Sequence, residues 1–194
     1  NVGNMNWMFA GCWKLTNLSV SNFDMHSVWT MLGMFSSCKG LTHIDVSKFN
    51  TENVKSMQAV FQNCENLSSL DLSGFNTSKV KDIACMFASC KSLTSLDLSN
   101  FDTQLVTQST SLFFKCQKLE AIYLGDKFSL EGLSKLYASN NMFGNCSATL
   151  YCSPAAYWAS KNCSRVKEAG QAVKPYVSIN KTSEYGTLCV PVGS

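Results

Sequence analysis

MFASCKSLTSLDLSNF, residues 86–101, is one of five versions of the same phrase in this chain. The other versions begin at residues 8, 34, 60 and 112, so the phrase returns every 26 residues with its apolar positions kept. A repeat of about 20–50 residues is the sequence signature of a solenoid. We therefore expect a stack of coils.

Each coil is expected to hold one strand and one short helix, as the third coil shows. Its apolar residues are Leu67, Leu70 and Leu72, and the last two are spaced by two residues, as in a strand with one buried face. The next apolar residues are spaced by three and four, as on a helix: Val80, Ile83, Met86 and Phe87. Strand and helix should alternate along the chain.

The Leu-x-x-Leu-x-Leu element within each phrase matches a leucine-rich repeat. The predicted fold is an α/β leucine-rich repeat solenoid, a right-handed β-α superhelix with 26-residue coils. A parallel β-sheet should form one face, short helices the other, and a cap should close the C-terminal end. Capping is needed because a coil buries its apolar face only against its neighbours.

Two parts are expected, a solenoid over residues 1–148 and a capping segment over residues 149–194. The solenoid opens with a half coil, 1–14, and its coils start near Leu15, Leu41, Leu67, Leu93 and Leu119. After Cys146 the phrase stops. In the cap we expect a strand through Ala148, Leu150 and Cys152, a helix from Ser153-Pro154 to Trp158, and a strand through Tyr176, Val177 and Ile179.

Cysteines recur once per coil, and we expect them to form an inward-facing ladder of free thiols. Equivalent side chains of adjacent coils should lie about 4.8 Å apart, wider than the ~3.8 Å between the Cβ atoms of a disulfide. The ladder comprises Cys12, Cys38, Cys64, Cys90, Cys116 and Cys146. A disulfide among Cys152, Cys163 and Cys189 stays open.

An Asp or Asn follows the Phe that closes each phrase, and we interpret it as a helix cap. Its side-chain oxygen can accept a hydrogen bond from the free amides that open a helix. The expected helix caps are Asp24, Asn50, Asn76 and Asp102.

Ligand binding is expected on the strand face, at the outward positions between core residues. The candidate residues are His43, Asp45, Ser69, Asp71, Ser95, Asp97 and Tyr123. Three of them form one acidic row, because Asp45, Asp71 and Asp97 share a coil position. The row is either a site for a cation or a basic protein, or a structural feature in which each Asp bonds a Ser or Thr of the neighbouring strand.

The full wording of the repeat, Met-Phe-x-x-Cys-x-x-Leu-Thr-x-Leu-Asp-Leu-Ser-x-Phe-Asp/Asn-Thr, closely resembles that of BspA-like leucine-rich repeat bacterial surface proteins. The resemblance covers residues 1 to about 128. It implies a secreted or surface-anchored protein, such as a lipoprotein or wall-anchored protein, that serves adhesion by binding host or extracellular proteins, including matrix and plasma proteins. It implies no catalytic residues. A passive spacer or stalk of a larger surface protein is the alternative.

Composition and motifs argue against several other functions. The sequence has no run of basic residues interleaved with aromatics, the pattern that would predict nucleic-acid binding. No stretch approaches the ~20 apolar residues of a transmembrane segment. No close Cys-x-x-Cys pair predicts a metal site, and no cofactor is expected. His43 and Asp45 are the only His-Asp neighbours on the strand face and have no nucleophile elbow, so we expect no enzyme activity.

The N-terminal end is expected to expose core residues. Asn1 and Val2 align with Ser27 and Val28, which indicates that the sequence opens halfway through a repeat. Met5, Trp7, Met8 and Phe9 should then lie at or near an uncapped edge. We expect self-association through this edge.

Overall fold

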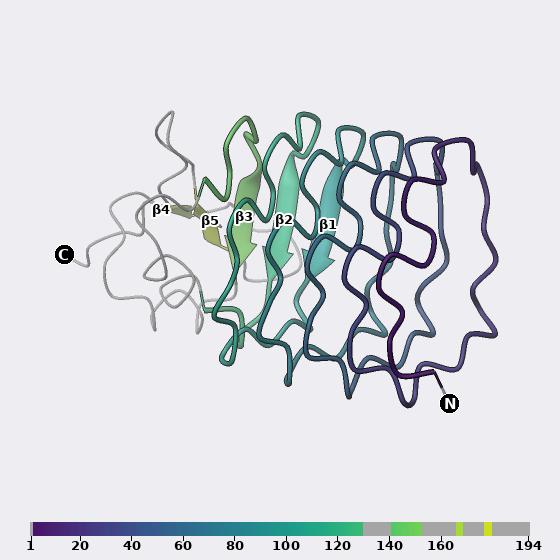
Figure 1. Cartoon of the computed structure of the whole chain (residues 1–194). Coiled ribbons are helices and arrows are strands. Elements are labelled where there is room, and N and C mark those ends of the chain that lie inside the picture. The colour runs from purple at the N-terminus through teal and green to yellow at the C-terminus, as the bar shows by residue number, and fades with distance from the viewer. Residues whose placement is uncertain (1, 130–140, 153–165, 169–176, 180–194) are drawn as a thin grey trace.

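A computed structural model describes residues 2–129, 141–152, 166–168 and 177–179, and it shows the chain wound into a stack of coils (Figure 1). The coils follow one another from the purple N-terminal end to the green strands. Parallel bridges join equivalent residues of consecutive coils: Asn4, Thr30, Ser56, Asp82 and Gln108. These bridges confirm the 26-residue step.

Three parallel strands lie side by side at the C-terminal end of the stack: β1 (Ser95–Leu98), β2 (Ala121–Leu124) and β3 (Thr149–Cys152). Two more strands extend this sheet in antiparallel fashion, β5 (Val177–Ile179) on β3 and β4 (Val166–Glu168) on β5. The strand order is therefore β1-β2-β3-β5-β4. In β1 the buried and exposed residues alternate, so that one face of the strand meets the core.

The strand predictions were correct at the C-terminal end and wrong in the first coils. β3 and β5 confirm the last strand after Cys146 and the strand near Val177. Among the described residues, however, the segments that start near Leu15, Leu41 and Leu67 form no strand. A backbone bond from Ser68 N to Thr42 O joins two of these segments, but no regular ladder follows it.

The prediction of short helices was wrong, because the described residues contain no helix. In the second coil Ala59 and Asn63 have φ angles of 56° and 58°, a left-handed conformation through which a right-handed helix cannot run. The chain makes tight turns there, such as the one closed by Cys64 N and Phe61 O at 3.1 Å. The amides of Ala59, Phe61 and Asn63 donate to carbonyl oxygens of the next coil at 2.8–3.0 Å.

The core consists of columns of side chains that run along the stack. Phe9, Phe35, Phe61, Phe87, Phe113 and Phe143 form one column, with neighbouring ring centroids 5.2–6.1 Å apart. A second column begins with Phe23, Phe49 and Phe75, whose neighbouring centroids are 6.3–6.5 Å apart. The two columns alternate along the sequence, so a Phe returns about every 13 residues, twice per coil.

Some predictions concern residues outside the described part. The helix expected between Ser153 and Trp158 lies there, as do Cys163 and Cys189. For Cys152 only the backbone is described, so the open disulfide question concerns side chains outside the described set. In the part that is described, no helix is long and apolar enough to cross a membrane.

Candidate functional site

The strand face carries one row that changes from acidic to aromatic along the stack. Strand register places Asp97 beside Tyr123 and Tyr123 beside Tyr151, while Asp45 and Asp71 hold the same position two coils and one coil before Asp97. The three Asp residues are exposed and the two Tyr residues are partly exposed. The Tyr rings stack with centroids 5.2 Å apart. We call these five residues the acid-aromatic row.

Tyr151 was missed in the sequence analysis. The alternation Ala148, Leu150, Cys152 already turned Tyr151 outward, and the row position of Tyr123 could have been extended to it. The longer step between the last two phrases, 30 residues in place of 26, hid this equivalence. The pairing of β2 with β3 settles the register.

Each Asp of the row accepts hydrogen bonds from the Ser two residues later in its own coil. Oδ1 of Asp45 accepts from Ser47 N at 3.1 Å and from Ser47 Oγ at 2.7 Å, and these bonds lower the pKa of Asp45. Oδ1 of Asp71 accepts from Ser73 N at 2.9 Å, which likewise lowers the pKa of Asp71. The expectation that each Asp bonds a Ser or Thr of the neighbouring strand is thus wrong, because each Asp accepts instead from the backbone amide two residues later in its own coil.

Asp97 makes the same turn, with Oδ1 2.9 Å from Ser99 N. Within the described part of the chain, no Lys, Arg or His forms an ion pair with any of the three Asp residues. Like charges at neighbouring positions repel, and Asp45 opposes the ionisation of Asp71. The row can therefore gain by binding a cationic group, through charge-assisted hydrogen bonds to Asp and cation–π contacts to Tyr.

The second predicted row lies two residues earlier in each coil. His43, Ser69 and Ser95 are exposed there, and Ser95 pairs in register with Ala121 and through it with Thr149. These residues flank the acid-aromatic row and supply hydroxyl and imidazole groups beside it. Within the described part, no group of three or more His, Cys, Asp or Glu residues is placed to hold a metal ion.

The four residues predicted as helix caps do accept amide hydrogen bonds, but from turns. Asp24, Asn50, Asn76 and Asp102 accept at 3.0–3.1 Å from the amides of the residues two positions later. No helix follows any of them, so the term helix cap is incorrect and each forms an Asx-turn. The Asn residues show that an amide oxygen makes this turn as well as a carboxylate does.

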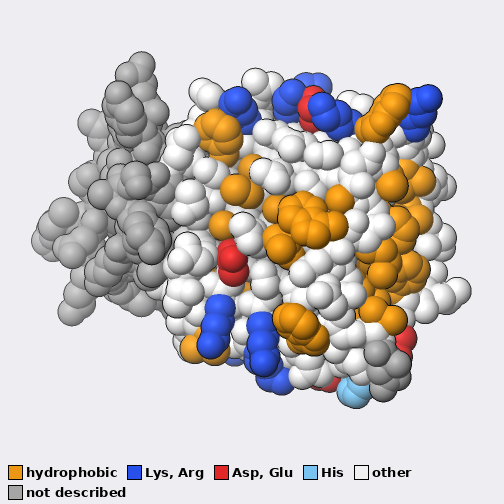
Figure 2. All heavy atoms as spheres, in the orientation of Figure 1, with side chains coloured by type: hydrophobic (Ala, Val, Ile, Leu, Met, Phe, Trp, Pro, Cys, Tyr) orange, Lys and Arg blue, Asp and Glu red, His pale blue; other side chains and the backbone are white. Residues whose placement is uncertain are grey.

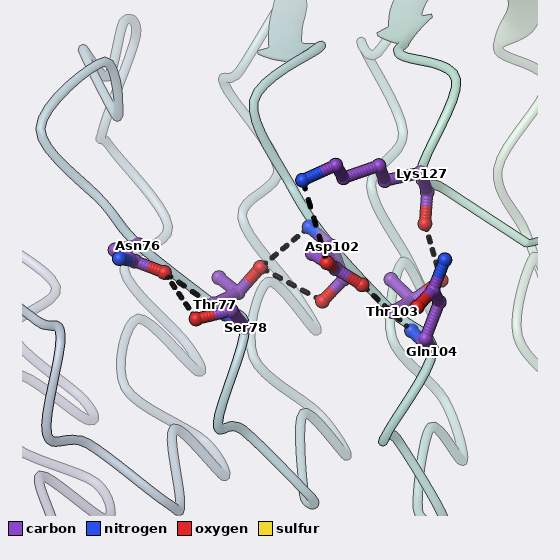
Figure 3. A network of polar contacts seen from close by, with 7 residues as sticks. All are labelled: Asn76, Thr77, Ser78, Asp102, Thr103, Gln104 and Lys127. Atoms are coloured by element: carbon purple, nitrogen blue, oxygen red, sulfur yellow. Dashed lines mark hydrogen bonds and ion pairs between the residues drawn. The ribbon is translucent and has the colours of Figure 1, made fainter.

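A ladder of buried threonines, also missed from the sequence, ties these turns together (Figure 3). Thr51, Thr77 and Thr103 are 0%, 2% and 4% exposed. The hydroxyl of Thr77 donates to Asp102 O at 2.9 Å and accepts from Asp102 N at 2.7 Å, so one side chain satisfies two backbone groups of the next coil. The signal was a Thr that recurs after Asn or Asp in successive coils.

The ladder cysteines are free thiols in the structure, and all except Cys12 are buried. Sγ of Cys38, Cys64, Cys90 and Cys116 donates to a Phe carbonyl oxygen of the preceding coil at 3.0–3.1 Å. Burial raises the pKa of Cys38 to about 11 and of Cys64 and Cys116 to about 12. These thiols stay protonated and structural at neutral pH.

Stacked coils, buried Phe and Cys columns and a small parallel sheet define a repeat protein with parallel strands. A model of the family described as Mycoplasma protein of unknown function, DUF285, matches residues 3–126 and 45–158. The chain belongs to this family. No curated protein and no solved structure matches the chain.

Proposed function

We propose that the chain is a non-catalytic recognition module that binds extracellular or host proteins through its strand face. The repeat wording resembles that of BspA-like leucine-rich repeat surface proteins, which supports a leucine-rich repeat class and a secreted or cell-surface location on a bacterium. The partner is expected to present Lys or Arg side chains to the acid-aromatic row. Matrix and plasma proteins are the expected partner class.

The observation that carries the proposal is the acid-aromatic row itself. Its carboxylates are exposed and form no ion pair among the described residues, while the stacked pair Tyr123 and Tyr151 continues the same line. Aromatic residues at the end of a charged row supply large contact area at low entropic cost. The coil stack holds all five side chains at fixed spacing, which is the preorganisation that favours binding.

The test uses the immobilised chain against a panel of matrix and plasma proteins. The variant is Asp45→Asn/Asp71→Asn/Asp97→Asn, because an Asn keeps the turn acceptor, as Asn50 and Asn76 do, and removes only the charge. Asp24→Asn/Asp102→Asn is the matched control, since it removes carboxylate charge from the Asx-turns at another corner of the coil.

Saturable binding whose affinity falls at least about tenfold in the triple variant, and stays within about twofold of wild type in the control, would support the proposal. Equal loss in both would show a response to net charge and count against a site at the row. Binding that survives in the triple variant would place the site elsewhere. No binding by folded wild-type chain would favour the passive spacer.

A further inference from the structure

Three lysine side chains gather where the second coil meets the third, outside the strand face. Lys55 and Lys81 share a coil position, and Lys81 N donates to Lys55 O at 2.9 Å. Lys79 reaches back to the coil of Lys55, where its Nζ donates to Asn53 Oδ1 at 2.9 Å. All three lysines are exposed, have described coils on both sides, and are here called the basic patch.

The charge of the basic patch is not neutralised within the described part of the protein. None of its lysines forms an ion pair there. Two acids lie nearby in the sequence, but Glu52 Oε1 pairs with His26 Nδ1 at 3.7 Å, and Asp82 Oδ1 accepts from Ala84 N at 2.9 Å. The amide oxygen that holds Lys79 is neutral, so the ammonium group keeps its full charge.

A second group of lysines shows the contrast. Lys39 and Lys91 both contact Glu65, at 3.1 and 2.6 Å, so that one carboxylate lies between two ammonium groups. Figure 2 shows both arrangements, with blue side chains around a red one at the upper edge and blue side chains between orange ones at the lower left. Like charges one strand spacing apart repel each other, so the basic patch gains by meeting an external anion.

Apolar side chains flank the basic patch along the stack. Trp29 holds the position of Lys55 one coil earlier, Leu105 holds that of Lys79 one coil later, and they are 51% and 52% exposed. The indole of Trp29 lies over Gly3, where a Cβ would come within 2.9 Å of the indole nitrogen. The ring is therefore held close to the backbone of the preceding coil, as a flat apolar surface beside the lysines.

We propose that this surface binds an acidic polysaccharide, whose anionic groups contact the basic patch while one of its sugar rings packs on Trp29. The inference is independent of the function proposed for the strand face, since the two surfaces share no residue. Lysines at one coil position recur about every 4.8 Å along the stack. A linear polyanion that lies along the stack can therefore meet them with successive charges.

The other side chains of this surface favour a polysaccharide over a membrane. Gln104, Thr107 and Gln108 are exposed beside the basic patch and carry neutral amide and hydroxyl groups, which can hydrogen-bond sugar hydroxyls. A surface that lies on a membrane buries a broad apolar face in the lipid. Here the exposed apolar residues lie only at the two ends, Trp29 and Leu105.

The test is fluorescence anisotropy of labelled oligosaccharides with the 194-residue chain. The acidic probes are an oligogalacturonate and a heparin fragment. Dextran of equal length carries rings without charge, and oligoglutamate with the carboxylate count of the oligogalacturonate carries charge without rings. The acidic probes should bind at least about tenfold more tightly than dextran, and the oligogalacturonate several-fold more tightly than oligoglutamate.

Two pairs of lysine variants of equal net charge locate the site. Lys55→Gln/Lys81→Gln should weaken binding of the acidic probes at least about tenfold and lower its salt dependence, because fewer counterions are released. Lys115→Gln/Lys118→Gln removes two exposed lysines elsewhere and should stay within about twofold of wild type. Trp29→Ala should weaken the acidic oligosaccharides several-fold and leave oligoglutamate binding unchanged. Denaturant unfolding shows whether each variant is folded.

Several outcomes would overturn the proposal. They are binding of neither acidic oligosaccharide by folded wild type, equal loss in the two lysine pairs, or a Trp29→Ala variant that binds the oligosaccharides as wild type does. Tighter binding of oligoglutamate would indicate an acidic protein as the partner. Phosphatidylglycerol vesicles that bind wild type and displace the acidic probes would indicate a membrane instead.

Discussion

The thiol of Cys64 donates a 3.1 Å hydrogen bond to the carbonyl oxygen of Phe35, a residue 29 positions earlier that lies in the preceding coil. The same bond recurs one coil later, from Cys90 to Phe61. A thiol is a weak donor, but here it satisfies a buried carbonyl and fills a small space between coils. The Cys column is thus a cross-coil link, which explains why each phrase carries the residue.

Stability should fall at alkaline pH because of these thiols. Burial raises the pKa of Cys64 from its ordinary value of 9.0 to about 12. In the unfolded chain the thiol ionises near pH 9, while in the folded chain it stays protonated, so its contribution is complete below pH 9 and is lost between about pH 9 and 12.

The free energy of unfolding should fall by about 1 kcal/mol per buried thiol between pH 8 and pH 10. Urea unfolding of wild type and Cys64→Ala at both pH values measures it. The variant should be less stable at pH 8 but should lose less stability on going to pH 10. A parallel decline of the two proteins would contradict the assignment to Cys64.

Thr77→Val should destabilise the protein by about 2 kcal/mol although it changes the shape of the side chain little. The change leaves Asp102 N and Asp102 O, both bonded to the Thr77 hydroxyl, without that partner. An unsatisfied buried polar group costs about 1–3 kcal/mol. Thr94→Val, at an exposed position, is the control and should change the free energy of unfolding by less than about 0.5 kcal/mol. Equal effects would show that the ladder does not stabilise the fold.

Two substitutions at Lys115 distinguish a turn from a helix, because the two structures predict opposite orders of stability for the variants. It is exposed and has a φ of 58°. Lys115→Gly should be more stable than Lys115→Ala by about 1 kcal/mol, because the Cβ of Ala makes the left-handed conformation sterically unfavourable and Gly has no Cβ. In a helix the order would be reversed by about the same amount. Thermal or urea unfolding of the two variants decides, and a more stable Ala variant would refute the turn.

Phe61→Ala should cost about 3–5 kcal/mol. Phe61 is 0% exposed and stacks between Phe35 and Phe87, with centroid distances of 5.6 and 6.1 Å. Its loss leaves a cavity in the middle of the column. Leu105→Ala, which truncates an exposed side chain, should stay within about 0.5 kcal/mol. The measurement is denaturant unfolding of both variants, and a small loss for Phe61→Ala would mean that the column collapses around the gap.

The sequence by itself determined the period of the stack and which side chains of each coil face inward or outward. The 26-residue period, the inward Phe and Cys positions and the outward Asp row follow from residue types at constant offsets, since a stack places equal offsets side by side. The sequence also showed the alternation that becomes β1 and β3, because inward and outward residues differ in polarity there.

Only the tertiary structure decided how the backbone runs between those positions. Apolar spacings of three and four residues fit a helix, but turns closed by bonds three residues apart produce the same spacing. The left-handed conformations at Ala59 and Lys115 are stabilised by bonds to the next coil, and neither residue type reveals them. The two hydrogen bonds between Thr77 and Asp102 and the stacking of Tyr123 on Tyr151 likewise join residues 25 or more positions apart. Contacts between coils therefore override the local preference, since each coil is stable only against its neighbours.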